Sequence, residues 1–267
     1  MPKELPISFT AEMVMAIREG RKTVTRRVIS ENDCWRNGLS KKHNVVSLDA
    51  AYPVTDGISL RVPYRHKNDP DCEGSNCGAW RVYPRWGKGD LLWVKESYCH
   101  GIEWDDCKPS EVDPLCGGND IWYFADGERP TEGWGKKRSS RFMPKWVART
   151  WLAVVSVRPE RVQDITEEDA IAEGIYVDEV HGCYQTAKGI GAYAGNARLA
   201  FRWLCSINAK RGYLWQSNPW VWRIEFKRVN HKYQIRKSEI SKEKLKWQRN
   251  RNKLRKQRKK RRMRKEI

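Results

Sequence analysis

The sequence predicts an α+β fold, and three observations support this prediction. Some segments alternate between apolar and polar residues as strands do, others place apolar residues at helical spacing and end at a glycine, and the C-terminal segment is dominated by Lys and Arg. We expect one main domain over residues 1–229, with a loop-rich insertion at about residues 30–86, where Gly, Pro and polar residues are frequent. Residues 230–267 are expected to form a basic tail, either helical or disordered.

Strands are predicted where apolar and polar residues alternate, at residues 22–28, 58–62, 91–96, 120–124, 148–158 and 220–227. Pro159 is expected to end the fifth of these strands. In the last strand Trp220, Trp222, Ile224 and Phe226 share one face, and the other face carries two cations and a carboxylate. This pattern is typical of a half-buried strand.

Three helices are predicted from apolar spacing and from their ends. The first covers residues 10–19 and stops at Gly20, and the second covers residues 166–173 and stops at Gly174. The third covers residues 196–207, and its apolar residues recur at helical spacing. These apolar residues are Leu199, Ala200, Trp203, Leu204 and Ile207.

The positive charge of the chain is concentrated at its C-terminal end. The whole chain has a formal charge of +19, and residues 230–267 contain 18 Lys and Arg against 3 Asp and Glu, which accounts for +15. This distribution favours a polyanionic partner, either nucleic acid or an anionic membrane surface. A solubilising tail or a nuclear targeting signal has the same composition. The densest run predicts salt-sensitive contacts with phosphates; it consists of Arg258, Lys259, Lys260, Arg261 and Arg262.

Composition also suggests where the protein works. No apolar segment follows Met1, and no run of 18 or more apolar residues occurs, so we expect a soluble, non-exported protein without a membrane partner. In that setting its eight cysteines are expected to be reduced thiols. Cys72 and Cys77, with His66 upstream, could nucleate a zinc site, but no second cysteine pair at ligand spacing completes it. We expect neither a metal nor a cofactor.

The segment with the strongest functional signal is residues 19–27, where a glycine turn precedes four cations and two threonines. A straight strand places Lys22 and Thr25 on opposite faces, so these side chains can meet only if the chain bends between them. Glu173 falls in the last turn of a predicted helix, where the helix dipole raises the free-energy cost of its charge. Its carboxylate therefore needs a cationic partner.

Four motifs, in this order, carry a resemblance to a known family: residues 20–27 (GRKTVTRR), 89–96 (GDLLWVKE), 166–173 (TEEDAIAE) and 218–226 (NPWVWRIEF). They resemble the ASCH domain family, and in particular the version encoded by bacteriophages and prophages. The resemblance implies a PUA-like, mostly antiparallel β-barrel with a few flanking helices and a cleft suited to a nucleotide or base. It also implies RNA binding and a location in the host bacterial cytoplasm.

The resemblance also implies three candidate catalytic residues. Some small bacterial ASCH proteins are amidohydrolases that remove the acetyl group from acetylcytidine, and their Lys, Thr and Glu triad corresponds by motif to Lys22, Thr25 and Glu173. These three residue types are consistent with nucleophilic catalysis. A Thr hydroxyl needs a neighbouring base to act as a nucleophile, and a Lys with a lowered pKa can be that base while a carboxylate orients the pair.

The cations around these motifs are the predicted contacts with nucleic acid. They are Arg21, Arg26, Arg27 and Lys95, and guanidinium groups bind phosphates with two parallel hydrogen bonds. The arginines would lower the pKa of Lys22 whereas the nearby carboxylate would raise it, so the sequence leaves the direction of that shift open.

Three functions are consistent with the sequence. The first is nucleic-acid binding, with RNA as the expected ligand, through a nucleotide-sized pocket around Lys22, Thr25 and Glu173 and a tail that adds affinity. The second is an amidohydrolase that acts on acylated cytidine or a related modified nucleoside. The third is an interaction protein that uses its tail on a host or virion component. Whether the chain is an enzyme stays open at this point.

Overall fold

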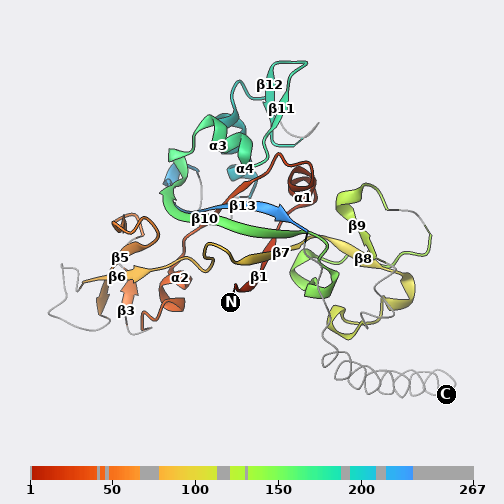
Figure 1. Ribbon diagram of the computed structural model, residues 1–267, viewed down its shortest axis with the longest axis horizontal. Helices are drawn as coiled ribbons and strands as arrows, with labels where there is room; N and C mark the ends of the chain where they lie inside the picture. The colour runs from red at the N-terminus through yellow and green to blue at the C-terminus, as the bar shows by residue number, and fades with distance from the viewer. Residues whose placement is uncertain are drawn as a thin grey trace, which may run out of the picture. The chain divides into compact units, whose positions relative to one another are not determined.

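The computed structural model, drawn in Figure 1, describes residues 2–40, 43–45, 48–66, 78–112, 121–129, 132–187, 193–208 and 215–230. The predicted zinc ligands Cys72 and Cys77, and the tail with its run from Arg258 to Arg262, lie outside these residues. The chain divides into two compact units. The first comprises Met1–Leu5, Ala16–Leu92 and Leu152–Val229, and the second takes in Pro6–Met15 and Trp93–Trp151.

The described residues contain four α-helices: α1 (Ala11–Arg18), α2 (Glu31–Arg36), α3 (Glu167–Ala172) and α4 (Ala197–Asn208). All three predicted helices are confirmed, and α2 is additional. Thr166 begins α3 as expected, because its hydroxyl accepts a hydrogen bond from Asp169 N at 3.1 Å. Among the described residues, no helix has both the length and the apolar character needed to span a membrane.

Short 3₁₀ helices occur at Ile102–Trp104, Pro109–Glu111, Phe124–Asp126, Ser140–Phe142, Lys145–Val147, Val162–Asp164 and Trp215–Ser217. The described strands are β1 (Glu4–Ser8), β2 (Val24–Val28), β3 (His43–Val45), β4 (Tyr52–Pro53), β5 (Leu60–His66), β6 (Gly78–Val82), β7 (Leu91–Lys95), β8 (Tyr98–His100), β9 (Ile121–Tyr123), β10 (Trp151–Arg161), β11 (Tyr176–Asp178), β12 (Cys183–Gln185) and β13 (Trp220–Val229).

These strands form several separate sheets. The largest has the order β1-β7-β10-β13-β2, and its pair β13–β2 is antiparallel. A second sheet has the order β3-β5-β4, with β6 also paired to β5, and β11–β12 and β8–β9 form two-stranded sheets. The fold is therefore mixed α and β. None of the sheets closes into a barrel within the described residues, so the barrel that the resemblance implies is not seen there.

Residues 30–86 contain more regular structure than the sequence predicts. α2 begins after Ser30, whose backbone N–H and hydroxyl both donate to Asp33 Oδ2 at 2.9 Å. β5 pairs antiparallel with β3, β4 and β6, and Leu60 and Val62 on β5 are fully buried. Short strands show too few alternations to be recognised one at a time, and their pairing partners lie far apart in the sequence.

β10 continues two residues beyond Pro159, where the sequence predicts its end. The start of β7 lies beside the middle of β10, since Gly89 N donates to Val154 O at 2.9 Å and Val154 N donates to Asp90 O at 2.9 Å. The C-terminal part of β10 therefore extends past β7. Proline has no N–H to donate, and a strand tolerates it where no neighbour needs that donor.

β13 is covered on both faces, although its sequence predicts a half-buried strand. Trp222 and Ile224 on one face are at most 1% exposed, and Val221 on the other packs in a core cluster with Ala170 of α3 and Phe201 of α4. Figure 1 shows α3 and α4 over the same side of β10 and β13. On this second face Arg223 is buried and bonds Asp169 of α3, whereas Lys227, further along the strand, is exposed.

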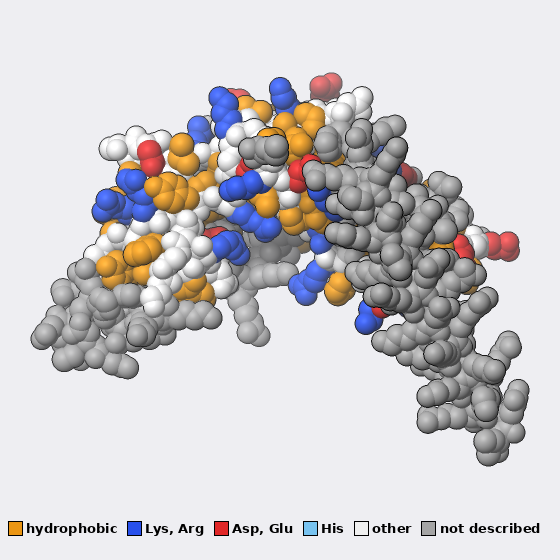
Figure 2. Space-filling view, turned by 60° about the horizontal axis from the view of Figure 1, so that its bottom comes forward, with side chains coloured by type: hydrophobic (Ala, Val, Ile, Leu, Met, Phe, Trp, Pro, Cys, Tyr) orange, Lys and Arg blue, Asp and Glu red, His pale blue; other side chains and the backbone are white. Residues whose placement is uncertain are grey.

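The surface combines cations with apolar groups. Figure 2 shows Lys and Arg side chains recurring among hydrophobic side chains on the described surface. Several large apolar side chains are more than 40% exposed, among them Ile58, Phe142, Leu199, Trp203 and Ile207.

Candidate functional site

The turn that carries Lys22 is held between the ends of α1 and α3. Gly20 ends α1 with a φ of +80°, a conformation that L side chains rarely adopt. Lys22 N then donates to Ala16 O at 3.0 Å, and Thr23 N donates to Ala172 O at 2.9 Å. These two backbone bonds place the Lys22 side chain beside the C-terminal end of α3.

Lys22 and Glu173 form a buried ion pair. Lys22 Nζ lies 2.6 Å from Glu173 Oε2, and the two side chains are 0% and 4% exposed. Nζ also donates to Glu173 O at 2.6 Å and to Val24 O at 2.9 Å. Burial lowers the pKa of Lys22, and the carboxylate of Glu173 opposes this shift. The structure therefore brings together two of the three predicted catalytic residues.

Gly174 makes the close approach of Lys22 to α3 possible. Its φ is +101°, and a Cβ at this position would lie 3.3 Å from both Lys22 Cβ and Ala16 Cβ. Glycine at position 174 therefore allows both the positive φ that ends α3 and the close packing of the Lys22 turn against α3.

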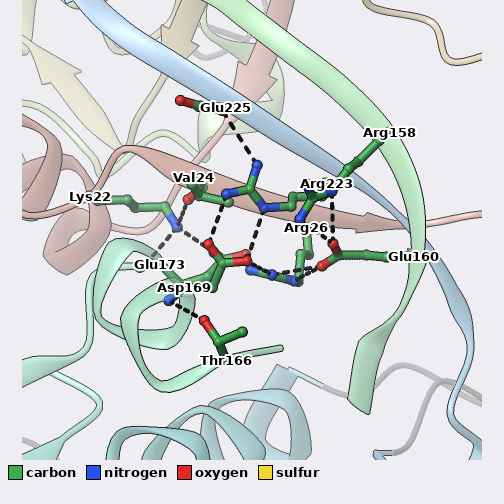
Figure 3. A network of polar contacts seen from close by, with 10 residues as sticks. All are labelled: Lys22, Val24, Arg26, Arg158, Glu160, Thr166, Asp169, Glu173, Arg223 and Glu225. Atoms are coloured by element: carbon green, nitrogen blue, oxygen red, sulfur yellow. Dashed lines mark hydrogen bonds and ion pairs between the residues drawn. The ribbon is translucent and has the colours of Figure 1, made fainter. Parts of the chain in front are cut away.

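Four further charged residues extend the pair into the network drawn in Figure 3. Arg26 Nε donates to Glu160 Oε1 at 2.7 Å, Arg26 Nη2 donates to Asp169 Oδ2 at 2.7 Å, and Arg26 Nη1 donates to Glu173 Oε1 at 3.2 Å. Arg223 binds Asp169 with two bonds, from Nε to Oδ2 at 3.0 Å and from Nη2 to Oδ1 at 2.8 Å. We call these six residues the ion network: Lys22, Arg26, Glu160, Asp169, Glu173 and Arg223.

The ion network holds the carboxylate of Asp169 in the charged form. Hydrogen bonds from Arg223 and then Arg26 lower the pKa of Asp169 to about 2, although burial acts in the opposite direction. The same bond to Asp169 raises the pKa of Arg223. In a buried setting, paired charges of this kind are expensive to separate, because each lost partner leaves an uncompensated charge.

The third predicted catalytic residue, Thr25, lies apart from the network. Thr25 is paired with Ile224 in the β2–β13 register, one residue away from the Arg26–Arg223 pair. Neighbouring side chains of a strand point to opposite faces, so Thr25 points away from the face on which Arg26 meets α3. The Lys22 Nζ hydrogen bonds go to Val24 and Glu173, and Thr25 takes no part in them. These hydrogen bonds of Lys22 therefore do not join it to Thr25.

The predicted nucleic-acid contacts near the turn lie in different environments. Arg26 is in the ion network with its side chain 3% exposed. Burial lowers the pKa of Arg27, and the charge of Glu173 opposes that shift. Arg21 is more accessible than Arg26, since its side chain is 29% exposed. Its guanidinium is bonded to Glu19 and to Gly174 O, and it lies 5.6 Å from the ring centre of Tyr176.

Lys95, the remaining predicted contact in the described chain, lies on the second unit. Its Nζ donates to the backbone carbonyl of Arg141 and lies 5.5 Å from the ring centre of Trp93. Phe142, the next residue, is 62% exposed. Burial and the charge of Arg141 lower the pKa of Lys95. We call Trp93, Lys95, Arg141 and Phe142 the Lys95 surface; within the described residues, neither cation is seen paired with a carboxylate.

Sequence reasoning missed Glu160, Asp169 and Arg223 as members of the network. The sequence does show that Asp169 has a structural role, because it stands three residues after the helix-capping Thr166, where an acidic residue favours the start of a helix. No pattern in a single sequence identifies Glu160 and Arg223 as members of the network, because they come close to Arg26 only through strand pairing and helix packing.

No group of three or more His, Cys, Asp or Glu side chains suited to a metal ion is present in the part of the chain that the structure describes. The ion network instead pairs each carboxylate with Lys or Arg. A scan against protein-family models finds no match, and neither do searches of curated proteins and of solved structures.

Proposed function

We propose that this chain is a nucleic-acid-binding protein of the ASCH type, with RNA as its ligand. The proposal includes the PUA-like barrel and the phage-type, host-cytoplasmic setting that the motif resemblance implies. The antiparallel β13–β2 pair, which joins two of the four motifs, supports it. The observation that carries the binding function is the Lys95 surface.

The Lys95 surface has the features of a phosphate and base contact. Lys95 Nζ donates to the backbone carbonyl of Arg141, which stands 46 positions away in the sequence, and burial together with the charge of Arg141 lowers the pKa of Lys95. Like charges held together favour binding of an anion. An exposed Phe142 beside them supplies a flat ring on which a base can stack, and such stacking contributes about 1–3 kcal/mol per base.

The ion network has a different role in this proposal. Its cations are buried and bonded to carboxylates, so they are not free to bind a phosphate. We infer that the network fixes α3 against β2 and β13, while Arg21, Lys95 and the cations of the tail contact the nucleic acid. The tail accounts for +15 of the net charge and would add affinity without sequence preference.

The test is a salt titration of RNA binding by the full-length protein. Anisotropy of a fluorescein-labelled single-stranded 12-mer RNA is measured for the wild type, for Lys95→Gln with Arg141→Gln, and for a variant with residues 258–262 changed to Gln. Each phosphate contact that is lost should reduce the slope of log K against log salt by roughly 0.7. Lys88→Gln with Lys108→Gln removes two exposed cations elsewhere and serves as the matched control.

Each result of this titration decides the proposal. Weaker binding by the Lys95 and Arg141 variant than by its control supports the Lys95 surface as the contact. Equal binding by these two variants, or no binding by folded wild-type protein, overturns it. A DNA 12-mer of the same sequence distinguishes the two nucleic acids, because only RNA offers the 2′-hydroxyl.

One observation favours a second candidate, the deacylation of acetylcytidine. Lys22 is buried, burial lowers its pKa, and Glu173 lies 2.6 Å away, as a base and its orienting carboxylate would. This candidate also requires Thr25 to reach Lys22, which would take a rearrangement of the turn before β2. A time course of acetylcytidine with wild type and Thr25→Val tests it, because loss of cytidine release in the variant assigns the nucleophile. Absence of turnover by folded wild type excludes this substrate.

A further inference from the structure

α4 has two apolar faces, and only one of them is buried. Ala197, Ala200 and Phe201 pack in the core cluster of the first unit, with Leu204 against it. Leu199, Trp203 and Ile207 lie outside this cluster and are 42%, 49% and 69% exposed. The sequence places Leu199, Ala200, Trp203, Leu204 and Ile207 together as helical apolar positions, but the fold divides them between the core and the surface.

The exposed apolar residues form a straight ridge along the helix. They are spaced four residues apart, and rows of residues at this spacing are the ridges that pack into grooves between the side chains of another helix. From Leu199 to Ile207 the ridge spans about 12 Å at 1.5 Å per residue. Its length and shape therefore fit two turns of a partner helix, whereas a single base would need only the ring of Trp203.

Charge determines what kind of helix fits. α4 contains no Asp or Glu, and Arg198 and Arg202 are exposed next to the ridge. Arg198 is partly tethered, since its Nη2 donates to Gln163 O at 2.9 Å. The guanidinium of Arg202 shows no ion pair with any residue that the structure describes. A second copy of the same face would bring these arginines together, so acidic residues on the partner complement them better.

We propose that the exposed face of α4, made of Arg198, Leu199, Arg202, Trp203 and Ile207, docks an acidic amphipathic helix of a protein partner. The partner's apolar residues pack on the ridge, and its carboxylates pair with Arg198 and Arg202. Trp and Arg are the residue types that contribute most at protein interfaces, which makes Trp203 and Arg202 the expected energetic centre. This docking face is independent of the Lys95 surface and does not depend on RNA binding.

The test uses two synthetic helical peptides with full-length protein. One peptide carries Leu at four-residue spacing flanked by Glu, and its matched control carries Lys in place of each Glu; both are fluorescently labelled for anisotropy. The acidic peptide should bind wild type at least tenfold more tightly than the Lys peptide. Trp203→Ala should weaken that binding about tenfold, and Ile58→Ala, which truncates a 50% exposed side chain elsewhere, should leave it unchanged.

Charge reversal gives the sharpest readout. Arg198→Glu with Arg202→Glu should invert the preference, so that this variant binds the Lys peptide more tightly than the Glu peptide. Equal affinity of wild type for both peptides overturns the proposal, as does an unaltered affinity in Trp203→Ala. Weaker binding of the RNA 12-mer by Trp203→Ala would assign the face to nucleic acid instead. A wild-type dimer in sedimentation that Trp203→Ala dissociates would assign it to a second copy.

Discussion

Arg26 lies directly opposite Arg223 in the pairing of β2 with β13, and both guanidinium groups donate to the carboxylate of Asp169. Two like charges on directly opposed strand positions destabilise a sheet unless an opposite charge lies between them. Asp169 supplies that charge from the first turn of α3, so one carboxylate joins two strands and a helix.

Asp169→Asn should destabilise the protein by roughly 2–4 kcal/mol, because the substitution leaves two largely buried arginines without their shared carboxylate. Urea unfolding measures this as a lower midpoint with an unchanged slope. Glu19→Gln breaks the exposed Glu19–Arg21 pair and is the control, with an expected change within about 0.5 kcal/mol. A similar small change for Asp169→Asn would mean that the network contributes little to stability.

Acid should unfold the protein partly through Asp169. The pKa of this carboxyl is about 2 in the folded chain against an ordinary value of 3.8, so the unfolded state binds more protons between these values. The stabilisation is present above pH 4 and is lost as the pH falls toward 2, and it amounts to about 2 kcal/mol. Unfolding free energies of wild type measured across this range should fall more steeply than those of Asp169→Asn. Parallel curves would contradict the assignment.

Gly174→Ala should cost more stability than Gly20→Ala. Both glycines have a positive φ, so both substitutions carry the backbone cost of about 1 kcal/mol. Only at Gly174 does the new Cβ also come within 3.3 Å of Lys22 and Ala16, whereas nothing lies within 4 Å at Gly20. The difference between the two variants in thermal or urea unfolding therefore reports the close packing of the Lys22 turn. Equal losses would show that this packing relaxes without cost.

Lys22→Met should destabilise the fold by roughly 3–5 kcal/mol, since Glu173 would remain buried with one cation fewer. Lys22→Met combined with Glu173→Gln should recover part of this loss, because neither charge is then left unpaired. Unfolding free energies of wild type, both single variants and the double variant give the coupling between the two residues. Additive losses would show that the two side chains act independently.

Several elements of this protein are predictable because their signals are local. Thr166 and Gly174 mark both ends of α3, and the alternation of Trp220, Trp222 and Ile224 predicts the strand that becomes β13. The approach of Lys22 to Glu173 was expected only through the motif resemblance. Residues 30–86 were harder to predict, because the strands there are short and pair with distant partners.

By itself the sequence determined where α1, α3 and α4 begin and end, which strand positions carry charge, and that most of the net positive charge lies after residue 229. These properties depend on residues close together in the chain. Only the tertiary structure decided that Arg26 and Arg223 share Asp169, that Thr25 points to the other face of the sheet, and that Trp203 is exposed. Each of these depends on strand pairing or helix packing between segments that are distant in sequence, and such contacts leave no periodic signal in a single chain.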